Sequence, residues 1–172
     1  MRTILVTLVL LVGIGSVLAQ EPSANEAAQA LIGKVAADFK LDLLGGGQAK
    51  LADHKGKDVV IIDFWATWCP PCVAELPQIA EVAKARADKG LVFYAVNEEE
   101  DATDVKRFLE EKKLTDVKVA LDKEGEVAKA YLVDPLPQTV IIGRDGVVKT
   151  VLIGIKSKED FAKAVDAAVA QK

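Results

Sequence analysis

The feature that most constrains the fold is the apolar run Val59–Trp65, which leads within four residues to Cys69-Pro70-Pro71-Cys72. A nearly continuous apolar run favours a strand that is covered on both faces, as in a mostly parallel sheet. The two prolines suit the first turn of a helix, because their fixed φ fits there and a missing N–H costs nothing. We therefore expect a buried strand, a dithiol just beyond its end, and a helix that begins at the dithiol.

Hydrophobic periodicity predicts alternating strands and helices along the rest of the chain. Before the apolar run, residues 39–43 and 48–51 flank three glycines and indicate a short hairpin. After it, we expect strands at 91–96, 117–121, 139–142 and 147–153, and helices from Pro70 to before Gly90 and at 102–113, 124–132 and 157–170. This order predicts an α/β fold with a central mixed sheet, helices on both faces, and an N-terminal β-hairpin extension.

The N-terminus differs in composition from the remainder. Arg2 is followed by an apolar stretch that ends at Ala19, the layout of a secretory signal peptide covering residues 1–19. The alternative is an uncleaved membrane anchor, but Thr3–Ala19 is shorter than the span of about 20 residues that a membrane helix needs. We interpret residues 20–30 as a linker or frayed helix, and 31–172 as one domain located outside the cytosol.

Composition excludes several classes of function. The net charge is −4 without a basic cluster, which disfavours nucleic-acid binding because phosphate neutralisation needs grouped cations. Two cysteines and the single His54 are too few for a closed zinc site or a disulfide framework. We therefore expect no metal and no cofactor, and a monomer whose chemistry depends on one local dithiol.

Cys69 is expected at the cap or first position of the helix. Unpaired backbone N–H groups and the positive end of the helix dipole there lower the pKa of a thiol from its free value of about 8.5. Because the thiolate is the nucleophile of disulfide exchange, Cys69 is the candidate attacking group. Cys72 lies one turn further on the same face and is the candidate resolving thiol. A purely structural disulfide is the alternative, but so small a ring removes little chain entropy.

The segment Trp65–Cys72, in its strand-to-helix setting, resembles the active site of thioredoxin-like proteins. The span 31–170 is similar to the exported branch that contains TlpA and ResA, including the N-terminal hairpin. The resemblance implies that Pro137 is cis and faces the dithiol, and that Leu136 aligns the substrate backbone. Many members have a different residue in place of Leu136. The same resemblance implies that a docking surface around the dithiol includes Trp68, Pro70 and Pro71.

Two acids are further candidates. Asp63 lies inside the apolar strand, where burial would raise its pKa. The resemblance implies that it exchanges a proton with Cys72; the alternative is an Asp that reaches water. Glu75 lies one turn beyond Cys72 and resembles a Glu that tunes the dithiol in the ResA-like branch; the alternative is a solvated Glu near a helix start. We interpret the acidic run Glu98–Asp101 as a solvated helix start rather than a cation site.

The leading interpretation is a thiol–disulfide oxidoreductase that reduces disulfide-containing exported proteins. The resemblance implies electrons from a membrane thiol-relay protein, and cytochrome c maturation as one use. One alternative is a thiol peroxidase, although Thr67 alone does not supply the Pro-and-Thr motif of peroxiredoxins. Another is a copper-delivery chaperone, which would need a His or Met near the dithiol, whereas the only candidates are His54 and Met1. The direction of electron flow stays open, because dithiols of this kind span about −270 to −120 mV.

Overall fold

The computed structural model describes residues 23–171, in which two cores pack on either side of one sheet. The expected signal peptide, residues 1–19, lies outside this range. Within the range, no helix is long and apolar enough to cross a membrane.

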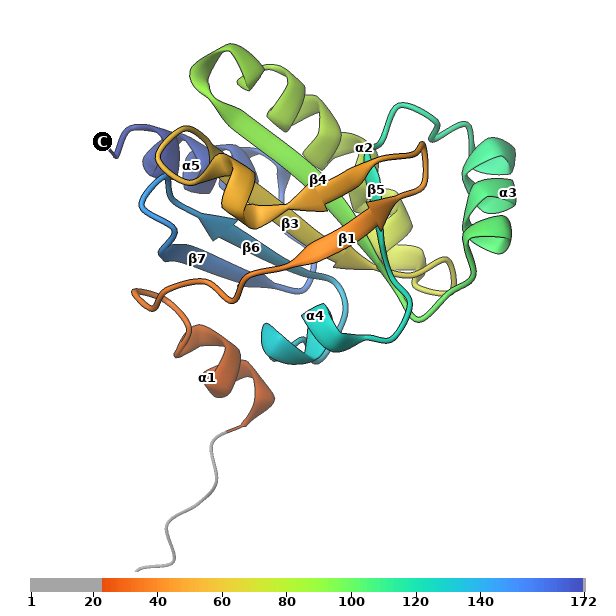
Figure 1. Cartoon of the computed structure of the whole chain (residues 1–172), viewed down its shortest axis with the longest axis horizontal. Coiled ribbons are helices and arrows are strands. Elements are labelled where there is room, and N and C mark those ends of the chain that lie inside the picture. Colours follow the sequence, from red (N-terminus) through yellow and green to blue (C-terminus); the bar gives the residue numbers. More distant parts are fainter. Residues whose placement is uncertain (1–22, 172) are drawn as a thin grey trace, which may run out of the picture.

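The sheet has seven strands in the order β2-β1-β5-β4-β3-β6-β7 (Figure 1). Strand β3 lies inside it, parallel to β4 and antiparallel to β6. Strands β4 and β5 are parallel, and the hairpins β1–β2 and β6–β7 are antiparallel. The predicted mixed sheet with an N-terminal hairpin is therefore confirmed. The strand bounds are β1 Lys40–Leu43, β2 Gln48–Lys50, β3 Val59–Trp65, β4 Leu91–Glu98, β5 Val119–Asp122, β6 Gln138–Ile142 and β7 Val148–Ile153.

Helices cover both faces of the sheet, as predicted. Side chains alternate along β3, so Val60, Ile62 and Phe64 pack in one core and Val59 and Ile61 in the other. The first core takes in residues of α1 and α4, and the second takes in residues of α2 and α5, while residues of α3 share a third cluster with the start of α2. The helix bounds are α1 Ala24–Gln29, α2 Pro70–Lys84, α3 Ala102–Lys112, α4 Glu126–Ala130 and α5 Lys158–Val169.

Helix α1 packs on the rest of the domain, within the residues 20–30 that we interpreted as a linker or frayed helix. Helix α1 begins with a capping box, in which Ser23 and Glu26 satisfy each other's backbone N–H groups. Ala28 is fully buried in the core, and the Gln29 side chain donates to the carbonyl of Val151 at 2.9 Å. A segment fixed by both apolar burial and a hydrogen bond to β7 is part of the domain.

Helix α4 is shorter than the predicted span 124–132. Gly125 adopts a left-handed conformation with φ +65°, which interrupts the helix at its start. The buried carboxylate of Asp122 then accepts from the backbone N–H groups of Val127 and Ala128, at 3.2 and 2.8 Å. These bonds fix the first turn of α4 against the end of β5.

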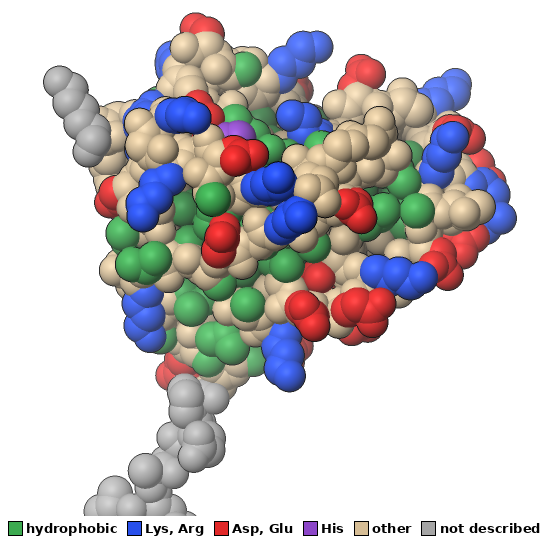
Figure 2. Space-filling view, in the orientation of Figure 1, with side chains coloured by type: hydrophobic (Ala, Val, Ile, Leu, Met, Phe, Trp, Pro, Cys, Tyr) green, Lys and Arg blue, Asp and Glu red, His purple; other side chains and the backbone are tan. Residues whose placement is uncertain are grey.

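On the face viewed in Figure 2, positive and negative side chains are intermixed rather than gathered into one basic patch. This distribution agrees with the net charge of −4. Nothing on this face offers the grouped cations that a nucleic-acid backbone requires.

Candidate active site

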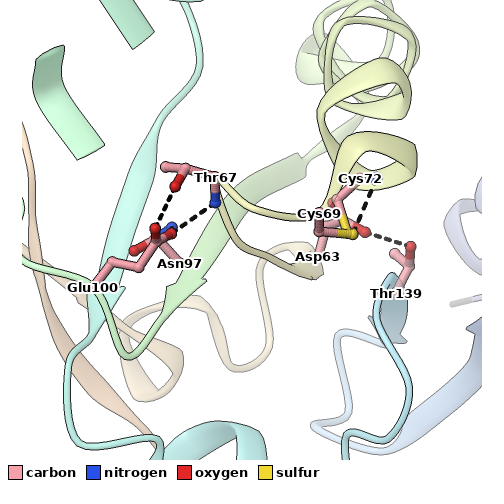
Figure 3. The surroundings of a disulfide bond; sticks show 7 residues. All are labelled: Asp63, Thr67, Cys69, Cys72, Asn97, Glu100 and Thr139. Carbon is pink, nitrogen blue, oxygen red and sulfur yellow. Dashed lines mark hydrogen bonds between the residues drawn. A yellow bond between two sulfur atoms is a disulfide. The ribbon is translucent and has the colours of Figure 1, made fainter. Parts of the chain in front are cut away.

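The predicted dithiol lies where β3 gives way to α2. Cys69 and Cys72 form a disulfide, with their Cα atoms 5.4 Å apart. Cys69 is the N-cap of α2, and its Sγ accepts from the backbone N–H of Cys72 at 3.4 Å (Figure 3). After reduction, this donor and the helix dipole would favour a thiolate at Cys69. Cys69 is 5% exposed and Cys72 is 1% exposed, so Cys72 is the more buried sulfur, as expected.

The residues around the disulfide divide into exposed and buried groups. The Trp68 side chain is 69% exposed, and Pro70 is also exposed, whereas Trp65 is fully buried. Pro71, which we expected in the docking surface, is half-buried. The exposed indole of Trp68 thus provides an apolar contact surface directly beside the nearly buried Cys69.

The predicted proline lies on the loop before β6. The Leu136–Pro137 peptide bond is cis, as the resemblance implied, and so is the Asp134–Pro135 bond. Pro137 is buried, and its carbonyl accepts from the backbone N–H of Gly154 at 2.8 Å. Leu136 is half-buried and packs against the apolar cluster that contains both cysteines. The structure thus brings Leu136 to the dithiol, which is more than 60 residues away in sequence.

Alternation along β3 places Asp63 beneath the first turns of α2. Ile61 packs with Ile79 further along α2, and Trp65 packs with Cys72 near its start. Asp63 lies between these two residues on the same face of β3, because side chains two apart on a strand point the same way. The carboxyl is therefore close to the dithiol in the protein interior.

Asp63 is fully buried with few partners. The Thr139 hydroxyl donates to its Oδ1 at 2.7 Å (Figure 3), while its Oδ2 has no hydrogen-bond partner. Loss of hydration raises the pKa of Asp63 to about 8, and the hydrogen bond from Thr139 only partly opposes this effect. The alternative in which this Asp reaches water is wrong, and Asp63 can hold a proton at neutral pH.

Glu75 is also buried, with 4% of its surface exposed. Its Oε1 accepts from the backbone N–H of Lys156 at 3.2 Å, and its Oε2 has no partner. Burial raises the pKa of Glu75, whereas the hydrogen bond and the positive charge of Lys156 lower it. The negative charge of Glu75 in turn raises the pKa of Asp63. The solvated alternative for Glu75 is therefore wrong, and the two acids interact electrostatically.

A third acid, Glu100, binds the loop that precedes Cys69, and the sequence analysis missed it. Its Oε2 accepts from the backbone N–H of Thr67 and from the Asn97 side-chain amide, both at 2.7 Å. Its Oε1 accepts from the Thr67 hydroxyl. The interpretation of Glu98–Asp101 as merely solvated is wrong for this residue. The contact between Glu100 and Thr67 could have been predicted only from the topology. Residues that follow neighbouring parallel strands, here β3 and β4, meet at the same end of the sheet.

The candidate ligands for a metal do not gather at the dithiol. In residues 23–171, no group of three or more His, Cys, Asp or Glu side chains is arranged to hold a metal ion. His54 instead contacts Asp58 through Nδ1 and the Tyr94 hydroxyl through Nε2, each at 2.9 Å. Tyr94 packs in the core on the opposite face of the sheet from α2, so His54 does not complete a copper site with the cysteines.

Comparison with known proteins agrees with this geometry. The AhpC/TSA family profile matches residues 32–151. The thiol-disulfide oxidoreductase ResA of Geobacillus kaustophilus is 36% identical over 166 residues, which cover 96% of this chain and 93% of that protein.

Two solved structures are similar throughout the domain. A thiol:disulfide interchange protein of the thioredoxin family from Chlorobium tepidum has a TM-score of 0.68 at 29% identity, covering 78% of this chain and 95% of that one. A secreted disulfide oxidoreductase from Mycobacterium tuberculosis has a TM-score of 0.64 at 26% identity, covering 75% and 95%. With its capped dithiol beside a cis-proline loop, the chain belongs to the thioredoxin-like AhpC/TSA family and is a thiol–disulfide oxidoreductase of the ResA type.

Proposed function

We propose that this protein reduces disulfides in exported proteins, with Cys69 as the attacking thiol and Cys72 as the resolving thiol. The observation that carries the proposal is the arrangement of the disulfide at the N-cap of α2, above a fully buried acid. The cap stabilises a thiolate at Cys69, and the acid provides a place for the proton of Cys72.

The reaction begins from the dithiol form. The Cys69 thiolate attacks one sulfur of the partner disulfide, which forms a mixed disulfide and releases the first partner thiolate. Cys72 then loses its proton and attacks Cys69 Sγ, which closes the disulfide seen here and releases the second partner thiolate. The protein loses two electrons and the proton of Cys72, and the partner gains two electrons and takes up two protons, the second of which comes from solvent.

Asp63 is the proposed proton acceptor for Cys72. A base works best when its pKa lies near the working pH, and the pKa of Asp63 is about 8. Glu75 is proposed to act through Asp63, since its charge raises the proton affinity of that carboxyl. Lys156 offsets part of this charge from the loop after β7.

Partner docking is proposed to use the exposed indole of Trp68 together with Pro70, Pro71, Leu136 and Pro137. Trp68, Pro70 and Pro71 flank the cysteines in the chain, and Leu136 packs on the cluster that contains both of them. The exposed apolar area suits an unfolded or extended partner segment that carries a disulfide. We propose that the protein acts on it as a monomer.

The expected signal peptide and one similar protein support the proposed compartment. One of the similar structures is described as secreted. We propose that the domain works in the periplasm or another extracytoplasmic space, cleaved after Ala19 or held by an N-terminal anchor. A membrane thiol-relay protein would then return electrons to the Cys69–Cys72 disulfide.

The experiment that tests the proposal is a redox titration of the purified protein in defined thiol buffers. A two-electron potential below about −250 mV supports a reductant. A value above about −150 mV would mean that the protein introduces disulfides instead, and the proposed direction would be wrong. Hydrogen-peroxide turnover by the reduced protein would favour the peroxidase alternative.

The roles of the two cysteines are separated by single substitutions. Cys69→Ser should abolish reduction of insulin disulfides, because the attacking thiolate is gone. Cys72→Ser should still attack but stop at the mixed disulfide, which mass spectrometry detects as a covalent adduct. Adduct formation by Cys69→Ser instead would reverse the assignment.

A further inference from the structure

The loop Ala66–Trp68, which joins β3 to the N-cap of α2, is held by a carboxylate from another part of the chain. Glu100 follows β4, more than 30 residues after this loop. It accepts the backbone N–H of Thr67 at 2.7 Å with one oxygen and the Thr67 hydroxyl with the other (Figure 3). Thr67 is therefore bound through both its backbone and its side chain.

Glu100 is itself fixed by the sheet. Asn97 is 1% exposed and lies opposite Trp65 in the parallel pairing of β3 with β4. Its side-chain amide donates to the same Glu100 oxygen that accepts the Thr67 N–H, at 2.7 Å. A continuous series of hydrogen bonds thus runs from the buried end of β4 through Glu100 to the loop before Cys69.

The position of this loop determines how Cys69 is presented. The Cys69 N–H donates to the carbonyl of Ala66 at 3.1 Å, so the turn that contains Thr67 also sets the N-cap of α2. Trp68 lies between Thr67 and Cys69 with its indole 69% exposed, and among the described residues no side-chain hydrogen bond to Trp68 is formed. The contacts of Thr67 with Glu100 are therefore the side-chain hydrogen bonds nearest to Trp68 on its N-terminal side.

We propose that Glu100 is a positioning residue for disulfide exchange, holding Thr67 so that Trp68 and Cys69 meet a partner disulfide in the reactive orientation. The inference deepens the proposed function and rests on it. Displacement of a reacting group by about 1 Å can cost about 10²-fold in rate, so losing one of several constraints should cost less than that. Neither Glu100 nor Thr67 exchanges an electron or a proton with the partner.

The chemistry of the amide side chain separates positioning from charge. In Glu100→Gln, the remaining oxygen can accept from the Thr67 N–H and from Asn97, and the new amide can donate to the Thr67 hydroxyl, which also accepts. The glutamine variant thus keeps the three contacts without the charge, and Glu100→Ala removes all three. Glu111→Ala removes a carboxylate from an exposed site on α3 and is the matched control.

The experiment compares these variants in the full chain by insulin reduction and by fluorescence of the oxidised protein. Trp65 is fully buried, so a soluble quencher such as iodide reports on Trp68. We expect Glu100→Ala to lower kcat/KM for insulin about tenfold and to lower the fluorescence anisotropy of the quenchable tryptophan. Glu100→Gln should stay within about twofold of the unmodified protein in rate, and Glu111→Ala should match it in both measurements.

The inference is overturned if Glu100→Ala keeps both the rate of insulin reduction and the anisotropy of Trp68. It is also overturned if Glu100→Gln lowers the rate as much as Glu100→Ala, since the charge of Glu100 and not its hydrogen bonds would then matter. If the unmodified protein fails to reduce insulin, the proposed function fails by itself. The anisotropy of Glu100→Ala in the oxidised protein then still decides whether Glu100 holds the loop.

Discussion

Three acids lie near the dithiol, and the surroundings of their carboxyl oxygens set Asp63 and Glu75 apart from Glu100. Asp63 on β3 and Glu75 on α2 are both buried, and each carboxyl has one hydrogen-bond donor and one oxygen without a partner. Glu100, at the edge of the same sheet, receives three donors. The comparison teaches that acids near one dithiol can have different tasks, because three donors let Glu100 hold a loop while Asp63 and Glu75 are left with unpaired oxygens.

The physical reason is the cost of burying charge. A carboxylate removed from water needs hydrogen bonds or a counter-charge, and without them it keeps its proton. Asp63 has only the Thr139 hydroxyl, so its pKa rises to about 8. The donors around Glu100 converge on it as an acceptor, which suits a structural contact and leaves it poorly placed to exchange a proton with Cys72.

The largest expected effect concerns stability. The pKa of Asp63 is raised from 3.8 to about 8, so between these values the folded protein binds more protons than the unfolded chain. Its stability therefore falls as the pH rises through this window, by up to about 1.4 kcal/mol per pH unit from this group. In Asp63→Asn this loss is absent, so the variant should gain stability relative to the unmodified protein as the pH rises from 4 to 8.

Urea unfolding of the oxidised protein at several pH values measures this difference. Glu111→Gln, at an exposed position, is the control and should follow the unmodified protein throughout. A constant stability difference between Asp63→Asn and the unmodified protein across the window would show that Asp63 is ionised in the fold. Asp63 would then not be the protonated acid that its few hydrogen-bond donors predict.

The same substitution should have the next largest effect on catalysis. Without a base for the Cys72 proton, Asp63→Asn should reduce insulin about 10²-fold more slowly at pH 7, the lower end of what a positioned base contributes. The mixed disulfide should accumulate, because attack by Cys69 comes before the impaired step. An unchanged rate of mixed-disulfide resolution in stopped-flow measurements would remove Asp63 from the mechanism.

Substitution of Glu75 should have a smaller effect, which tests whether Glu75 acts through Asp63. The exchange rate should rise with pH as Asp63 ionises. Because the charge of Glu75 raises the pKa of Asp63, Glu75→Gln should move this rise to lower pH. The rate at pH 7 should change by less than about tenfold, since Glu75 acts through its neighbour. In an Asp63→Asn background, Glu75→Gln should shift nothing. A shift of the same size in both backgrounds would mean that the two acids act independently.

Sequence reasoning predicted the buried Asp63 and missed Glu100 for a definite reason. Asp63 lies within an uninterrupted apolar strand, and Cys69 follows that strand at a helix start marked by prolines, so their environments are encoded locally. The contact of Glu100 with Thr67 depends on the pairing of β3 with β4, and no local pattern distinguishes Glu100 from Glu99 beside it.

In the fold, too, the features encoded by local sequence were predicted and those that depend on tertiary contacts were not. The order of strands and helices, the hairpins and the closing helix follow from periodicity and turn residues, and they are confirmed. Residues 20–30 were interpreted as a linker or frayed helix because they are Ala-rich and polar, and only the tertiary contact of Ala28 with the core shows that α1 packs on the domain. The burial of Glu75 was left open because helical spacing alone does not show that Lys156 and its loop cover that side of α2.

The smallest expected effect tests whether the acidic run takes any part in proton transfer. Burial, followed by the charges of Asp122 and Glu99, raises the pKa of Glu98 from 4.5 to about 7. Like Asp63, Glu98 therefore costs stability as the pH rises between these values. Its side chain is partly exposed and screened by water, so the loss should stay below about 1 kcal/mol per pH unit. Glu98→Gln should remove this loss in urea unfolding and leave insulin reduction unchanged at every pH. A slower exchange in Glu98→Gln, with a shifted pH profile, would show that a raised pKa at this edge of the sheet also serves the dithiol, because stability alone cannot move that profile.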